Sequence, residues 1–179
     1  MTDAYKELNK KLADIREVFD VQLILAGKSD IREVERYYRI NRWAYTLFHS
    51  RGGFIHMGLS RDGRYKSEDL LEPLKVVETY MKSVKAKRVL ELGIGRGANS
   101  EYLAIQNPLV SFFGLDIPGG QTVHAQKRAE RHRNLDITTG DFHNLDMFKD
   151  QSFDVVFVIE ALCHSNKKRN SHKRSAPCA

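Results

Sequence analysis

The chain has few cysteines and no long hydrophobic run, and both shortages exclude classes of protein. Its two cysteines in 179 residues, Cys163 and Cys178, are too few for a disulfide-stabilised scaffold. They lack metal-ligand spacing to each other or to a histidine pair, so we expect reduced thiols and no metal site. The longest apolar runs, such as 155–159, are about a quarter of the length of a bilayer crossing, which argues against a membrane span.

The N-terminal sequence MTDAYKELNKK also lacks an apolar stretch. It mixes acids and bases, so it does not have the pattern of a secretory signal peptide. We therefore expect the protein to be cytoplasmic.

The chain also has fewer acidic than basic residues, and its net charge is +6. The distribution of this charge matters more than its total. Residues 164–179 contain five basic residues and no acid, which leaves +1 for residues 1–163. The nearly neutral body argues against a specific nucleic-acid site in the fold, and the composition of the tail favours a disordered, solvated end.

The length is that of one domain with an N-terminal extension. We expect a helical extension or lid over residues 1–66, a sheet-containing domain over 67–163 and the basic tail over 164–179. The first helix of the extension has an apolar stripe, namely Leu8, Leu12, Ile15 and Phe19. After Gly27, a capping-box pattern at Asp30 and Glu33 begins an aromatic-rich helix. Glycines and charges mark residues 50–66 as a loop.

From Lys87 onward, short apolar segments alternate with amphipathic ones, which is typical of a parallel sheet covered by helices. The predicted strands are Arg88–Leu92, Val110–Asp116, Leu135–Thr138 and Phe153–Ile159. The predicted helices are Ser67–Met81 with an irregularity at Pro73, Ala98–Gln106 and Gly120–Arg131, and a turn covers Asp146–Asp150. The predicted fold class is α/β, with a Rossmann-like sheet of about four parallel strands.

A glycine-rich turn follows the first predicted strand, in the segment VLELGIGRGANS. Gly93, Gly95 and Gly97 lie between a strand and a helix N-terminus, where doubly wound sheets bind ligands. Glycine leaves the backbone open to a ligand there and permits positive φ. The free N–H groups of the helix start suit a carboxylate or a phosphate. A glycine-rich loop alone is a weak indication of a ligand.

Acidic residues at the ends of three successive strands strengthen that indication. They are Glu91, Asp116 and Asp141. A carboxylate about twenty residues beyond such a loop can accept hydrogen bonds from ribose hydroxyls, which suits Asp116. For Asp141 taken alone, a simple role as a cap or turn residue stays open.

The glycines also permit a dinucleotide site, because Gly93, Gly95 and Ala98 satisfy the G-x-G-x-x-A pattern. Glu91 and Gly97 argue against that interpretation. The Glu91 carboxylate would face a positive group of a ligand rather than a pyrophosphate. An NAD(P)-dependent oxidoreductase is therefore the less favoured alternative.

Residues 67–165 resemble the class I S-adenosylmethionine-dependent methyltransferases, whose E/D-x-G-x-G-x-G motif stands here as ELGIGRG. S-adenosylmethionine carries an ammonium and a sulfonium, which suit an acid in this motif. The resemblance implies that Glu91 and the three glycines hold the methionine end of this cofactor, and that Asp116 holds its ribose. The further cofactor-binding residues that it implies are Ile117 beside the adenine, Asp141 and Phe142 at the far edge of the adenine, and Gln121.

Residues 153–165, FDVVFVIEALCHS, resemble the fourth strand and the following turn of the sterol C-methyltransferases. The upstream FHSRGGFIHMG loosely resembles the aromatic N-terminal segment of sterol and tocopherol methyltransferases. These likenesses imply a small, lipophilic acceptor, with Glu160 and His164 as catalytic residues near the transferred methyl group. Residues that would line or cover an apolar acceptor pocket are Tyr37, Tyr38, Trp43 and His56. For the aromatic helix, core packing is the alternative.

Methyl transfer requires mainly position and electrostatics from the protein. If the acceptor atom is oxygen or nitrogen, His164 or Glu160 would remove its proton as a general base. If the acceptor is an alkene, Glu160 would stabilise the resulting cation. An exposed position in the tail is the alternative for His164.

The chain departs from the family in having four predicted strands instead of seven, after which the sequence has the character of a foreign ending. The fourth strand would then be an open sheet edge, which native proteins usually cover. Two hypotheses follow: a small-molecule methyltransferase, or a truncated, non-catalytic cofactor-binding or interaction fragment. In the second case a partner strand or a second copy of the chain would cover the edge.

Overall fold

The computed structural model describes residues 3–18, 36, 40–41 and 52–165 of the chain. It forms two compact units, residues 1–30 and residues 31–179, which we describe separately.

The first unit contains helix α1 (Asp3–Val18), which confirms the first helix expected from the sequence. The Lys11 ammonium lies 2.9 Å from the Glu7 carboxylate one turn earlier. The described side chains of the predicted apolar stripe, Leu8, Leu12 and Ile15, are exposed. Phe19, the predicted capping box and the aromatic residues Tyr37, Tyr38 and Trp43 lie outside the described residues.

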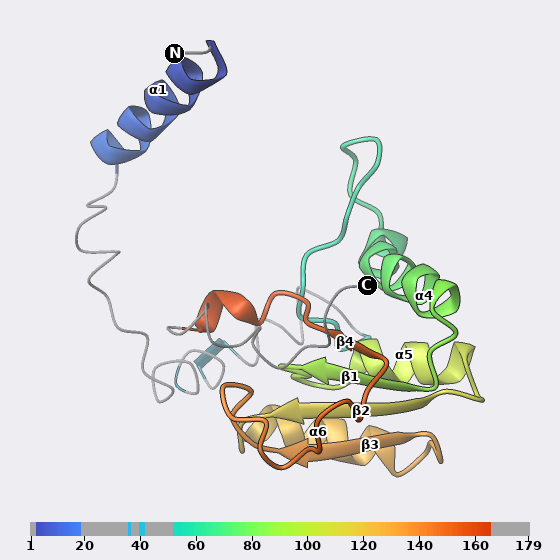
Figure 1. Cartoon of the computed structure of the whole chain (residues 1–179). Coiled ribbons are helices and arrows are strands. Elements are labelled where there is room, and N and C mark those ends of the chain that lie inside the picture. The colour runs from blue at the N-terminus through green and yellow to red at the C-terminus, as the bar shows by residue number, and fades with distance from the viewer. Residues whose placement is uncertain (1–2, 19–35, 37–39, 42–51, 166–179) are drawn as a thin grey trace. The chain divides into compact units, whose positions relative to one another are not determined.

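The second unit contains a sheet of four parallel strands, as expected for a Rossmann-like fold (Figure 1). The strands are β1 (Arg88–Leu92), β2 (Ser111–Asp116), β3 (Leu135–Thr139) and β4 (Val155–Phe157). Their order across the sheet is β3-β2-β1-β4. In the part of the chain that the structure describes, β4 pairs with β1 only.

Strand β4 is shorter than the predicted Phe153–Ile159, which was wrong at both ends. At the start, one carboxylate oxygen of Asp154 accepts the N–H groups of Lys87 and Arg88, at 2.7 and 2.9 Å. The Asp154 carboxylate therefore occupies the two backbone N–H groups that would pair with the residues of a longer β4. At the other end, the last pair of the ladder joins Phe157 to Glu91, because β1 soon turns away into the glycine loop.

Helices follow the strands in the alternating order that the sequence predicts. The predicted helix Ser67–Met81 is in fact a 3-10 helix, η2 (Ser67–Leu71), followed by α4 (Glu72–Ser83). The change occurs just before Pro73, which suits the first turn of a helix because it has no N–H to donate. Helix α5 (Ala98–Gln106) has the predicted bounds, and α6 (Gly120–Ala129) ends two residues early. A second short 3-10 helix, η3 (Leu162–His164), follows β4.

The sheet is packed on both faces by residues that alternate along its strands. On one face, α4 and α5 cover Val89, Phe112 and Val155 through a buried cluster that includes Leu74 and Leu103. On the other face, a second buried cluster consists of Leu90, Leu92, Leu115 and Phe142. Since Glu91 stands between Leu90 and Leu92, its side chain points to the helix-covered face, toward α5.

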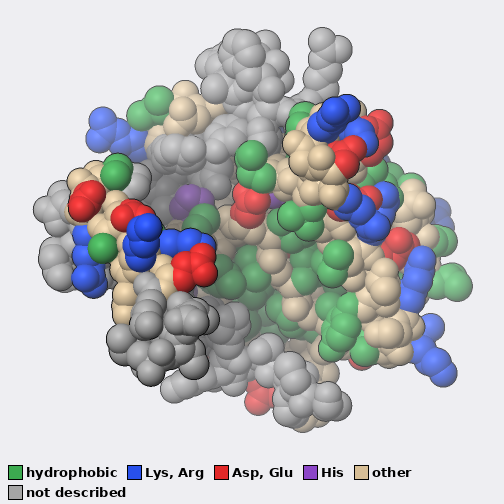
Figure 2. Space-filling model, turned by 90° about the horizontal axis from the view of Figure 1, so that it is seen from above, with side chains coloured by type: hydrophobic (Ala, Val, Ile, Leu, Met, Phe, Trp, Pro, Cys, Tyr) green, Lys and Arg blue, Asp and Glu red, His purple; other side chains and the backbone are tan. Residues whose placement is uncertain are grey.

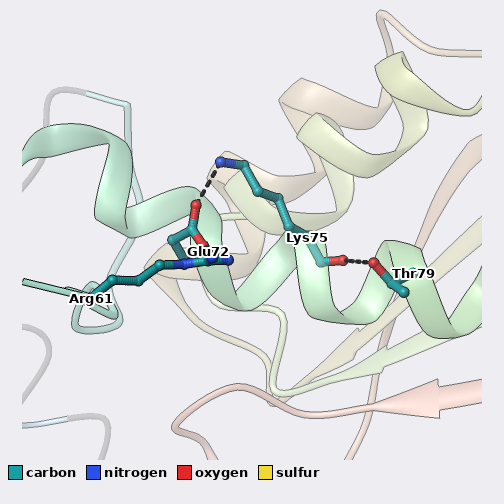
Figure 3. A network of polar contacts seen from close by, with 4 residues as sticks. All are labelled: Arg61, Glu72, Lys75 and Thr79. Carbon is teal, nitrogen blue, oxygen red and sulfur yellow. Dashed lines mark hydrogen bonds and ion pairs between the residues drawn. The ribbon is translucent and has the colours of Figure 1, made fainter.

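A network of polar contacts ties the start of α4 to the loop before it (Figure 3). Glu72 accepts a hydrogen bond from Lys75 at 2.6 Å and from Arg61 at 2.8 Å, and both cations lower the pKa of its carboxyl. Thr79 donates its hydroxyl to the Lys75 carbonyl at 2.7 Å. Such exposed ion pairs contribute at most about 1 kcal/mol each, so this network orients the helix more than it stabilises the fold.

The described surface mixes charges of both signs, with red and blue side chains interspersed in the space-filling view (Figure 2). None of the helices that the structure describes has the length and apolar character needed to span a membrane. Within the same residues, no group of three histidine, cysteine or acidic side chains is placed to hold a metal ion.

Candidate functional site

The glycine loop between β1 and α5 adopts a backbone that requires glycine. Gly93, Gly95 and Gly97 have φ angles of 69°, 55° and 80°, which side chains rarely tolerate. Space is short as well, because a Cβ on Gly97 would lie 3.0 Å from the backbone of Ala125 in α6. The positive φ that the sequence suggests is therefore confirmed at all three glycines of the motif.

Asp116, at the end of β2, is hydrogen-bonded to this loop. Its carboxylate accepts the Gly95 N–H at 2.6 Å and the Ile117 N–H at 2.8 Å. Burial raises the pKa of Asp116, while the two backbone hydrogen bonds and the nearby His164 oppose that rise. The structure thus brings together Gly95, Asp116 and Ile117, which are three of the cofactor-binding residues predicted from the sequence.

Glu91 is buried against the start of α5. Its Oε1 accepts a hydrogen bond from Asn99 Nδ2 at 2.8 Å, and its Oε2 accepts one from Ser100 Oγ at 2.6 Å. Only 1% of the residue is exposed, and burial raises the pKa of its carboxyl to about 7 although both hydrogen bonds lower it. Side chains of α5 therefore hold the carboxyl, and direct contact with a ligand's positive charge stays a prediction.

Asn99 and Ser100 are functional candidates that the sequence analysis missed. Both are buried, although they belong to the first turn of a helix that packs against the sheet. Buried polar side chains require partners, and such a pair so soon after a strand acid could have indicated the contact with Glu91. Asn99 also faces His56, whose Nε2 lies 3.0 Å from Asn99 Oδ1. The structure thus places His56, which was expected to line or cover an acceptor pocket, in the interior beside α5.

Glu160 and His164 lie in the segment that follows β4. Glu160 has a φ of 55° and an exposed side chain, and its Oε1 accepts the Met57 N–H at 3.0 Å. His164 is half-buried in η3, so it is not the exposed tail residue that one alternative supposed. Burial lowers the pKa of His164, and the charge of Asp116 opposes that effect. The ends of β2 and β4 therefore bring an acid and a histidine close to each other.

The loop after β3 places Asp141 and Phe142 differently. Phe142 is buried with Leu90 and Leu115 in the core, under the glycine loop. Asp141 is exposed, and its Oδ1 accepts hydrogen bonds from the backbone N–H of His143, at 2.9 Å, and from the His143 Nδ1, at 2.6 Å. Of the remaining predicted cofactor residues, Ile117 and Gln121 are half-buried near the start of α6.

Hydrogen bonds join Asp141 to His143 and His143 to Ser165. This is the same order of acid, histidine and serine as in the catalytic triad of a serine hydrolase. His143 Nε2 lies 2.7 Å from Ser165 Oγ. A nucleophilic serine must reach a carbonyl carbon of a substrate, but only 3% of Ser165 is exposed. These hydrogen bonds therefore connect the loop after β3 to the segment after η3 and are not a hydrolytic site.

A comparison with protein families identifies the domain that carries this site. Residues 89–174 match the family described as "Methyltransferase domain", and this match includes the glycine loop, Asp116 and the segment after β4. The part of the chain that carries this site is therefore similar to a methyltransferase domain. The match reaches into the stretch 164–174 that the sequence analysis assigned to a tail, most of which lies outside the described residues.

Curated proteins that are similar to this part of the chain come from mycobacteria. A phthiotriol/phenolphthiotriol dimycocerosates methyltransferase of Mycobacterium ulcerans is 38% identical over 78 residues, which are 44% of this chain and 28% of the relative. A fatty-acid O-methyltransferase of Mycolicibacterium smegmatis is 33% identical over 78 residues, with the same two shares. The chain therefore matches less than a third of the length of each relative.

Solved structures support the same fold. A Galdieria sulphuraria protein assigned as a sarcosine dimethylglycine methyltransferase superposes with a TM-score of 0.61 and 22% identity, over 74% of this chain and 51% of the other. The CurJ carbon methyltransferase superposes with a TM-score of 0.51 and 19% identity, over 60% of this chain and 32% of the other. At these identities the superpositions establish the Rossmann-like methyltransferase fold of the domain.

Proposed function

We propose that the chain binds S-adenosylmethionine and takes part in methyl transfer to a small, lipophilic acceptor. The hydrogen bond from Gly95 to Asp116 carries the proposal, because it joins the glycine loop to the acid expected at the ribose. The match of residues 89–174 to the methyltransferase domain family supports the same function.

The residues present fit this cofactor. The two backbone hydrogen bonds to Asp116 leave lone pairs on its carboxylate for the hydroxyls of a ribose. Beside it, a Cβ on Gly119 or Gly120 would meet no atom within 4 Å, so the loop after β2 is open to a ligand. The buried Glu91 would supply negative charge for the ammonium and sulfonium groups through a medium of low dielectric constant.

When bound, S-adenosylmethionine supplies the reactive methyl group, and the chain's own residues bind and orient the reactants. Asp116 would hold the ribose, and the glycine loop would hold the methionine end. Glu160 is the stronger candidate for a general base, because the Met57 N–H fixes Oε1 and leaves Oε2 for an acceptor proton. His164 is the second candidate.

The names of the curated relatives support a lipid acceptor, since they describe enzymes that act on phthiotriol dimycocerosates and fatty acids. We therefore favour a lipid with a hydroxyl or carboxyl oxygen. We further propose that the protein works in the cytoplasm and that the sheet-containing domain covers residues 67–163. A non-catalytic, cofactor-binding fragment whose β4 edge is covered by a partner or a second copy is the alternative.

Isothermal titration of the full chain with S-adenosylmethionine tests the proposal. We expect saturable binding that weakens about tenfold or more in Asp116→Asn, because a carboxylate accepts ribose hydroxyls better than an amide does. Asp136→Asn is the matched control, because Asp136 is an exposed acid on β3, and its affinity should match the wild type. A folded wild-type chain that releases no heat would overturn the cofactor proposal.

A second assay separates the enzyme from the fragment. The full chain is incubated with S-adenosylmethionine labelled in its methyl group and with a lipid extract. Label in the lipid fraction supports the methyltransferase, whereas cofactor binding without transfer supports the fragment.

A further inference from the structure

Residues 52–58, GGFIHMG, lie against the loops of the proposed cofactor site, and we refer to them as the strap. Their contacts with the rest of the domain span large distances along the chain. The Gly52 carbonyl accepts a hydrogen bond from Arg128 of α6 at 2.7 Å. A Cβ on Gly95 would lie 2.6 Å from Ile55 Cδ1, so the Ile55 side chain covers the centre of the glycine loop.

The strap also contacts Glu160, the candidate base. The Met57 N–H donates to Glu160 Oε1 at 3.0 Å, across 103 positions of sequence. Glu160 is one of three residues other than glycine with positive φ in the described part of the chain. A backbone donor therefore fixes a side chain whose own backbone conformation is strained.

A chain of buried hydrogen bonds runs from the strap to Glu91. The Glu91 carboxylate can only accept hydrogen bonds when ionised, so the Asn99 atom that faces it is Nδ2. Asn99 Oδ1 then faces His56 Nε2 at 3.0 Å, and the other ring nitrogen, Nδ1, lies 3.0 Å from the Met57 carbonyl. Both neighbours are acceptors, so the ring donates to both only when it carries two N–H groups, and Nε2 is the donor to Asn99. His56, Asn99 and Glu91 are 3%, 9% and 1% exposed, so bulk water does not compete for these hydrogen bonds.

We propose that the strap is part of the S-adenosylmethionine site and that His56 is a positioning residue for Glu91. This inference rests on the proposed function. The imidazole sets the rotamer of the Asn99 amide, and the amide holds one oxygen of the Glu91 carboxylate beneath the glycine loop. The strap thereby contacts the glycine loop through Ile55, Asn99 through His56, and the candidate catalytic carboxylate of Glu160 through Met57.

The physical reason is the cost of leaving buried polar atoms without partners. Without the His56 donor, Asn99 Oδ1 loses its partner, and the amide can rotate so that its carbonyl oxygen meets the carboxylate. Two oxygens that face each other repel, and the carboxylate then loses a donor. The cofactor's positive charge would meet a displaced or protonated acid and bind less tightly.

Titration calorimetry with S-adenosylmethionine and S-adenosylhomocysteine on three variants of the full chain tests the role of His56. We expect His56→Ala to weaken binding about tenfold, the effect of losing one hydrogen bond to a charged network. His56→Gln, whose amide can donate to Asn99, should stay within about threefold of the wild type. Leu59→Ala is the matched control, because Leu59 lies just outside the strap and its side chain is 54% exposed.

A double-mutant cycle with Glu91→Gln distinguishes positioning from simple packing. If His56 acts through Asn99 on Glu91, His56→Ala should have little further effect on affinity in the Glu91→Gln background. Independent effects that multiply would overturn the inference, as would wild-type affinity in His56→Ala. The melting temperature of each variant identifies any that do not fold, and His56→Gln then decides the outcome.

The same data separate the two proposals. A folded wild type that binds neither ligand contradicts the proposed function and the inference with it. A wild type that binds while His56→Ala binds equally well contradicts the inference alone.

Discussion

The N–H of Gly95 lies 2.6 Å from Oδ2 of Asp116, and this hydrogen bond joins the loop after β1 to the end of β2. Because β1 and β2 are parallel neighbours, both loops emerge at the same edge of the sheet. The bond aligns the glycine loop with the acid. A ligand that bridges the two would therefore find both parts of its site in place before it binds.

Gly95→Ala should destabilise the fold and abolish cofactor binding. The new Cβ would require a residue other than glycine at a φ of 55° and would lie 2.6 Å from Ile55. Strain of this kind costs about 1 to 3 kcal/mol, which urea unfolding measures. Gly119→Ala is the stability control, since its φ of 171° suits any residue and its Cβ would meet no atom within 4 Å. Equal stability of the two variants would contradict the prediction.

Glu91 should make the stability of the fold fall as the pH rises from about 4.5 to 7. The pKa of its carboxyl rises from 4.5 to about 7 in the folded state, so the folded protein binds more protons than the unfolded chain in this window. The stabilising contribution is complete below the unfolded pKa and is lost as the pH passes the folded pKa. The change is on the order of 3 kcal/mol. Urea unfolding at pH 5 and pH 8 measures it.

Glu91→Gln provides the comparison for that prediction. An amide does not titrate, so the variant should show a smaller decrease in stability between the two pH values. The same decrease in both proteins would assign the pH dependence to other groups.

Glu160→Gln should lower the rate of methyl transfer without a large change in cofactor affinity. The amide keeps an oxygen for the Met57 N–H but cannot take a proton, and loss of a general base reduces rates by about 10² to 10⁴. Single-turnover transfer to a lipid acceptor and titration calorimetry give the two quantities. Cys163→Ser is the control, because its hydroxyl can replace the thiol that donates to the Glu160 carbonyl. An unchanged rate would exclude Glu160 as the base.

Asp154→Ala should lower the free energy of unfolding by about 1 kcal/mol, because two backbone N–H groups lose an ionised acceptor near solvent. The backbone hydrogen bonds of Lys87 and Arg88 lower the pKa of Asp154 below its usual 3.8. The stabilisation is therefore present above about pH 4 and is lost as the pH falls through the lower folded pKa. Asp150→Ala removes an exposed acid nearby and should have little effect at either pH.

The positions of β1 and α5 were predicted exactly because both depend on local pattern. A short apolar run before a glycine turn favours a strand, and the helix starts directly after Gly97, whose left-handed backbone conformation sets the boundary. The bounds of β4 depend on a partner instead. Its apolar run extends beyond Phe157, but the ladder with β1 ends at Glu91, one residue before β1 itself ends, and no pattern within residues 153–159 contains that information.

The sequence by itself determined the α/β fold class, the glycine loop and the acid at the end of β2. Each depends on residues within a few positions of one another or on a spacing along neighbouring strands. Only the tertiary structure decided how Glu91 is held and which residues support it. The contact between His56 and Asn99 spans 43 positions, and the contact between Met57 and Glu160 spans 103. Such contacts arise when separate loops pack at one edge of a sheet, and local sequence patterns do not encode that packing.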